Sequence, residues 1–129
     1  INDSKSTSFE SSKSALKNNK NIYWILGGLP KKGDVFRVNN FKKNITKAYI
    51  IGENTKYFRK YIERKVSFTL SNTLKKAVHA VFKEIKRAND TKATILFSPA
   101  SASYDQFKNF EDRGNKFKSL IKPFLKRFK

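Results

Sequence analysis

Two segments, far apart in the sequence, place hydroxyl groups where helices are expected to begin. The first is Asp3-Ser4-Lys5-Ser6-Thr7, where Thr7 and Glu10 have the spacing of a capping box. The second is the small-residue loop Ser98–Ser103, where Ser103 and Gln106 have the same spacing. The first turn of a helix has free N–H groups and a positive dipole end, so it favours anions. The sequence alone leaves open whether Thr7 and Ser103 bind an anion or only cap their helices.

A third loop, Gly27-Gly28-Leu29-Pro30-Lys31-Lys32-Gly33-Asp34, follows an apolar run. It has neither the spacing of a phosphate-binding P-loop nor that of a dinucleotide-binding glycine motif. On its own it predicts a turn that carries two lysines. His79 lies among lysines away from any apolar stripe, and Glu111 and Asp112 are helical neighbours that do not face each other. Neither His79 nor this carboxylate pair therefore points to acid–base catalysis.

The elements that must position these loops are short apolar runs alternating with helical patterns. Strands are expected at residues 22–26, 48–52, 66–69 and 93–97. Helices are expected at residues 8–17, weakly at 37–43, after a cap at Asn54, at 72–88, and from Tyr104 onward with a break at Gly114 and a kink or restart at Pro123. The strongest pattern is the stripe of helix 72–88, formed by Leu74, Ala77, Val78, Val81, Phe82 and Ile85.

This alternation predicts a single α/β domain, with a mostly parallel sheet and helices on both faces. Ligands of such sheets bind at the carboxyl ends of the strands, so the informative loops follow Leu26, Ile51 and Phe97. The apolar stripe of the last segment, residues 115–129, could instead bind a membrane surface. We expect it to pack on the sheet, because a domain this small needs that apolar area.

Composition narrows the function classes. The 129 residues fit one domain, and the absence of cysteine together with a single histidine excludes disulfide scaffolds, thiolate metal sites and histidine-rich metal clusters. No apolar run reaches the roughly 20 residues of a membrane helix. The chain begins at Ile1 without an initiator Met, so we expect it to be a segment of a longer polypeptide.

The net charge of +19 has two interpretations. A basic nucleic-acid-binding module is one, and its binding should weaken steeply with salt. However, 23 of the 29 basic residues are lysines and only 6 are arginines, whereas arginine is the residue suited to bidentate phosphate and base recognition. Lys, Asn, Ile and Phe are all residues of A/T-rich codons, so a skewed genome also accounts for this surface.

The three loops together resemble the Mur ligases, in particular those that add D-glutamate. The resemblance is carried by residues 2–7, by Leu26-Gly27-Gly28 and, most specifically, by residues 98–114. It spans residues 1–129 as the C-terminal domain of such a ligase and implies a Rossmann-like fold. The N-terminal UDP-binding domain and the central ATPase domain of the family would lie outside this chain.

The resemblance also implies roles for individual residues. Thr7 and Ser103 resemble hydroxyl ligands of the D-glutamate carboxylates, and Phe110 resembles a backbone ligand in the same site. Lys31 resembles the lysine that neutralises a D-glutamate carboxylate, although Lys32 could take that role, and Leu29 departs from the acidic residue of some relatives. Asp3 and Lys5 resemble residues on the nucleotide side of the closed cleft.

The activity implied is ATP-dependent amide-bond formation in cytoplasmic peptidoglycan synthesis. The carboxylate of UDP-N-acetylmuramoyl-L-alanine would become an acyl phosphate, which the amine of D-glutamate attacks. ATP and Mg²⁺ would be bound mainly by the central domain, and none of the catalytic or metal-binding residues is expected in this chain. We therefore expect the isolated domain to be inactive and monomeric, and to bind neither a membrane nor nucleic acid.

Overall fold

The computed structural model describes residues 1–4, 9–28, 38–100 and 107–127. In these residues a four-stranded, all-parallel sheet has the strand order β3-β2-β1-β4. The strands are β1 (Ile22–Gly27), β2 (Ile45–Ile51), β3 (Phe68–Asn72) and β4 (Thr94–Phe97). The helices are α1 (Phe9–Asn18), α2 (Thr55–Ile62), α3 (Leu74–Ala88) and α4 (Phe110–Arg127), with 3₁₀ turns η1 (Val38–Asn40) and η2 (Lys42–Asn44).

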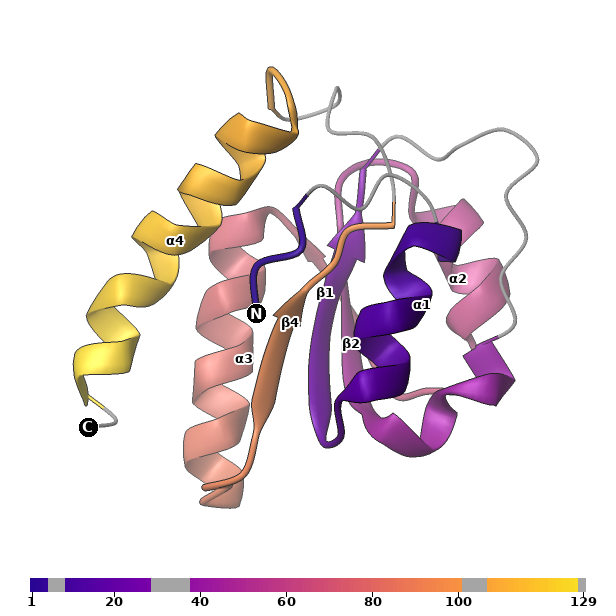
Figure 1. The fold of residues 1–129 in the computed structure, drawn as a ribbon, viewed down its shortest axis with the longest axis horizontal. Coiled ribbons are helices and arrows are strands. Elements are labelled where there is room, and N and C mark those ends of the chain that lie inside the picture. The colour runs from indigo at the N-terminus through magenta and orange to yellow at the C-terminus, as the bar shows by residue number, and fades with distance from the viewer. Residues whose placement is uncertain (5–8, 29–37, 101–106, 128–129) are drawn as a thin grey trace.

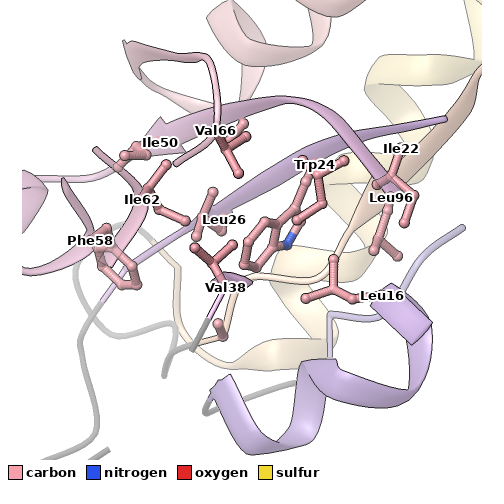
Figure 2. Close-up of a cluster of buried hydrophobic side chains, with 13 residues drawn as sticks. Leu16, Ile22, Trp24, Leu26, Val38, Ile50, Phe58, Ile62, Val66 and Leu96 are labelled. Atoms are coloured by element: carbon pink, nitrogen blue, oxygen red, sulfur yellow. The ribbon is translucent and has the colours of Figure 1, made fainter. Parts of the chain in front are cut away.

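Helices cover both faces of the sheet (Figure 1). Alternate residues of β1 point to opposite faces, and each face has its own core. On one face Trp24 and Leu26 pack with α1 and α2, as Figure 2 shows. On the other face Tyr23 and Ile25 pack with α3, and Phe117 of α4 joins them. The predicted α/β fold, a single Rossmann-like domain with a parallel sheet between helices, is confirmed.

The predicted apolar stripe of α3 is confirmed, because all six of its residues are buried. The helix begins after Thr73, whose hydroxyl accepts a hydrogen bond from the Lys76 N–H at 3.1 Å. It ends at Asn89, which has the left-handed conformation common at helix C-termini (φ 52°). His79 is exposed, as predicted, and its ring lies 5.1 Å from that of Phe124.

Four expectations at the level of elements were wrong. The third strand was expected at residues 66–69 but lies at 68–72, and the second begins at Ile45 rather than at Ala48. Asn54 precedes α2, but its side-chain oxygen makes no capping bond; its amide nitrogen donates to the Gly28 carbonyl at 2.9 Å. A weak helix was expected at 37–43, but the described residues of this stretch, from Val38 onward, form the two 3₁₀ turns.

The last helix also differs from the prediction. It begins at Phe110, after bends at residues 107–109, and it continues through both Gly114 and Pro123; the expected start at Tyr104 lies outside the described residues. The Asn109 side chain accepts from the Asp112 N–H at 2.8 Å, so Asn109 caps this helix. Phe117 packs against Phe97 of β4, with ring centroids 4.8 Å apart, while Phe124 stacks on Phe82 of α3. The predicted packing on the sheet therefore holds for the first half of the helix.

A polar cluster closes the amino ends of β1 and β2. The Asn21 amide and the Tyr23 hydroxyl donate to the Asp90 carboxylate at 2.9–3.0 Å, and Thr46 donates to the Asn21 carbonyl at 2.6 Å. Burial, together with the bond to Asp90, raises the pKa of Tyr23 to about 12. Burial raises the pKa of the neighbouring Tyr49 as well, because its ionised form would also be desolvated.

These raised pKa values predict a loss of stability in alkali. Unfolded tyrosine ionises near pH 10, whereas folded Tyr23 keeps its proton until about pH 12. Between these values the folded state binds more protons, so the free energy of unfolding falls as pH rises. Urea unfolding of the wild type from pH 9 to 12 should show this fall, and it should be shallower in Tyr23→Phe. Equal slopes in the two proteins would contradict the assignment.

Candidate functional site

The carboxyl ends of the parallel strands lie at one edge of the sheet, and the amino-terminal residues reach the same edge. Asn2 forms a parallel bridge with Phe97 beside β4. The Phe97 N–H donates to the Ile1 carbonyl at 2.9 Å, and the Asp3 N–H donates to the Phe97 carbonyl at 2.7 Å. Residues 1–3 thus extend the sheet beyond β4, as Figure 1 shows, and run parallel to it.

A side-chain contact joins this segment to the loop that follows β4. The Ser98 hydroxyl donates to the Asp3 carboxylate at 2.6 Å, and the Ser98 and Ser12 hydroxyl oxygens lie 2.7 Å apart. Ser98 is fully buried and opens the small-residue loop, whereas Asp3 opens the segment that carries Thr7. The two hydroxyl-bearing segments of the sequence therefore start side by side.

The first turn of α4 is bound to the same segment. The Ser4 hydroxyl donates to the Phe110 carbonyl at 2.7 Å, and the Asn2 amide donates to the Gly114 carbonyl at 3.1 Å. The Arg113 guanidinium donates to the Ser4 carbonyl at 2.6 Å and to its hydroxyl at 3.2 Å. An open hollow of about 330 Å³ lies over this junction, lined by Asn2, Ser4, Phe110, Glu111, Gly114, Asn115 and Lys118.

The glycine loop begins next to the other two segments. The Gly27 N–H donates to the Pro99 carbonyl at 2.9 Å, and the Trp24 indole N–H donates to the Ser98 carbonyl at 2.7 Å. Gly27 has φ +128°, a conformation available essentially to glycine alone. The described starts of all three candidate loops therefore meet at the carboxyl end of β1 and β4.

Most of the predicted site residues lie outside the described part of the chain. These are Thr7, Lys31, Lys32 and Ser103, expected at D-glutamate, and Lys5, expected on the nucleotide side. Asp3 and Phe110 are described, and the contacts above bring both to the same junction. The Phe110 carbonyl already accepts from Ser4, so a backbone contact from Phe110 to a ligand would use its N–H in the first turn of α4.

Sequence reasoning gave no role to Ser4 or Arg113, although both stand in the segments that it singled out. Both are buried, with 5% and 1% of their surface exposed. The composition did set Arg113 apart, because it is one of only 6 arginines among 29 basic residues. Arginine is the basic residue that can bind two acceptors at once with its planar fork.

Within residues 1–4, 9–28, 38–100 and 107–127 there is no group of three or more His, Cys, Asp or Glu side chains that could hold a metal ion. No helix in those ranges is long and apolar enough to cross a membrane. The junction brings together the Asp3 and Glu111 carboxylates, several backbone groups and the amino end of an 18-residue helix.

Several known proteins are similar in sequence to this chain over almost the whole length of the chain. It is 42% identical, over 94% of the chain, to the UDP-N-acetylmuramoylalanine–D-glutamate ligase of Nitrobacter winogradskyi. Ligases of the same name from the Wolbachia of Brugia malayi and from Bartonella henselae are 44% and 43% identical, over 91% and 94% of the chain. The chain matches the C-terminal domain of these D-glutamate ligases.

The similarity covers most of this chain but only part of each relative. The chain spans only 23–26% of the length of the three ligases. No protein-family model matches the chain. The predicted resemblance to the D-glutamate-adding ligases is confirmed, and the alternative of a basic nucleic-acid-binding module is not supported.

Proposed function

We propose that this chain is the part of a D-glutamate ligase that binds the incoming amino acid. The complete enzyme would join D-glutamate to UDP-N-acetylmuramoyl-L-alanine through an acyl phosphate made at the expense of ATP. The observation that carries the proposal is the Asp3–Ser98 contact of 2.6 Å, because it holds together the starts of the two hydroxyl-bearing segments. The similarity to ligases that carry D-glutamate in their names supports the choice of substrate.

The chemistry of D-glutamate fits this end of the sheet. The substrate has two carboxylates, which need donors, and one amine, which must stay free to attack. Helix N-termini with hydroxyl groups, plus one lysine, suit two carboxylates. We assign Thr7, Ser103 and Lys31 (or Lys32) to these carboxylates, with the Phe110 backbone beside them. Asp3 and Lys5 would face the nucleotide.

Catalysis by this part of the enzyme would come from positioning. Holding the amine against a reactive acyl group lowers the entropic cost of the reaction and needs no general base in this chain. ATP and Mg²⁺ would be held mainly by the central domain, and UDP-N-acetylmuramoyl-L-alanine by the domains that precede this one. The enzyme would act in the cytoplasm, where nucleotide-activated substrates are made.

The test uses a complete ligase, with residues 1–129 joined to the first two domains of a related ligase. Thr7→Ala and Ser103→Ala should each raise the KM for D-glutamate about tenfold or more, because a hydrogen bond to a charged group contributes about 1.5–3 kcal/mol. The measurement is D-glutamate-dependent phosphate release. Residues 1–129 alone should release no ADP.

The control is Ser119→Ala on the exposed side of α4, which should leave the KM unchanged. Thr7 and Ser103 would be helix caps and nothing more if their replacement lowered the melting temperature without changing the KM. The loss of a cap costs about 1 kcal/mol of stability.

A further inference from the structure

We propose that Arg113 is a positioning residue. It fixes the amino-terminal segment against the first turn of α4 and so helps to set the geometry of the proposed D-glutamate site. This inference rests on the proposed function and adds a residue to it. Arg113 is 1% exposed, so its guanidinium is buried in the protein. Its guanidinium donates to the Ser4 carbonyl at 2.6 Å through one nitrogen and to the Ser4 hydroxyl at 3.2 Å through another.

A chain of hydrogen bonds connects the amino-terminal segment to the first turn of α4. The Ser4 hydroxyl accepts a hydrogen bond from Arg113 and donates one to the Phe110 carbonyl at 2.7 Å. Its neighbour Asp3 accepts from Ser98 at 2.6 Å. Arg113, Ser4 and Phe110 therefore form a clamp, called here the Ser4 clamp, that links the chain before Lys5 and Thr7 to the helix that follows Ser103.

The geometry of this clamp favours arginine at position 113 and glycine at position 114. A lysine would offer one compact ammonium group, which cannot reproduce two bonds from separate nitrogens of a planar fork. A Cβ on the next residue, Gly114, would lie 3.1 Å from the Ser4 Cβ and 3.4 Å from the Asn2 amide nitrogen. The absence of that atom lets α4 approach the amino-terminal segment closely enough for Arg113 to reach Ser4.

The Arg113 side chain also rests on the sheet. The guanidinium carbon lies 6.0 Å from the centroid of the Phe97 ring, and the Phe97 backbone is bonded to both Ile1 and Asp3. The clamp is thus supported by the last residue of β4, and it can transmit the position of the sheet edge to Asp3. Losing it should loosen the segment that carries Asp3, Lys5 and Thr7 without opening either core.

The experiment uses the complete ligase described above, with Arg113→Lys as the variant and Arg87→Lys, on the exposed side of α3, as its matched control. Arg113→Lys should raise the KM values for D-glutamate and for ATP at least fivefold. The KM for UDP-N-acetylmuramoyl-L-alanine should stay within twofold, because that substrate would be bound by the preceding domains. Partial unfolding would instead lower kcat and leave every KM unchanged. Arg87→Lys should change none of these values.

A second measurement does not depend on ligase activity. Hydrogen exchange in Arg113→Lys should be at least tenfold faster at the Asp3 amide, while Leu26 and Tyr49 in the centre of the sheet keep the wild-type rate. An unchanged rate at Asp3 would overturn the clamp, even if the wild-type protein proved to have no ligase activity. Faster exchange at Asp3 with an unchanged KM for D-glutamate in an active enzyme would overturn the positioning role and leave the proposed function intact.

Discussion

Replacing Gly27 with alanine is expected to destabilise the domain by about 4 kcal/mol, a large share of the roughly 5–15 kcal/mol of a typical fold. A Cβ at Gly27 would lie 2.1 Å from the Ile51 carbonyl oxygen and 2.9 Å from the Ile51 nitrogen. Both are backbone atoms of the paired strand β2, so relief requires the central β1–β2 ladder to shift. The φ of +128° adds strain of its own for any residue with a side chain.

Urea denaturation of the 129-residue chain measures this effect. The matched control is Gly52→Ala, which also changes a glycine with positive φ (+85°) just after β2. Its expected cost is about 1 kcal/mol, the conformational term alone. Equal unfolding midpoints for Gly27→Ala and Gly52→Ala would show that the close approach to Ile51 does not matter.

Replacing Trp24 with alanine should cost about 4 kcal/mol, within the range for truncating a buried aromatic residue. Trp24 is fully buried, and its ring lies among Leu26, Val38 and Leu96 in Figure 2. The indole also reaches the candidate site, because its N–H donates to the Ser98 carbonyl at 2.7 Å. The change would therefore leave a cavity and an unpaired carbonyl at the start of the loop after β4.

Trp24→Phe separates these two contributions. It keeps most of the apolar volume but removes the N–H, so about 2 kcal/mol should be lost through the unpaired Ser98 carbonyl and the smaller ring. Leu70→Ala serves as the control, because Leu70 is 46% exposed and its truncation should cost less than about 1 kcal/mol. A Trp24→Ala protein as stable as Leu70→Ala would contradict the packing in Figure 2.

Sequence periodicity predicted the parts of the fold whose positions depend on local pattern. The stripe of α3 and the apolar runs of β1 and β4 are examples, because residues buried on one face or on both are apolar and recur with the period of the element. The extents of β2 and β3 were missed. β2 begins at Ile45 because that residue pairs with Ile22, and β3 is an edge strand whose length depends on its register with β2.

The candidate site was predicted as a pair of hydroxyl-bearing segments, and the structure adds what holds them together. The segments that carry the resemblance include Ser4 and Arg113, to which spacing along the chain assigned no role, and Gly114, which it predicted only as a helix break. Their contacts join positions more than 100 residues apart, such as Ser4 and Phe110. No local pattern records such a pair.

The amino-acid sequence by itself determined the alternation of strands and helices, the parallel sheet and the similarity to D-glutamate ligases, because these depend on periodicity and on residue identity. Only the tertiary structure decided that residues 1–3 extend the sheet beside Phe97, that α4 runs unbroken through Gly114, and that Arg113 is buried on Ser4. The physical reason is that these features follow from hydrogen bonds and close approaches between distant segments, which form only when the sheet has set their positions.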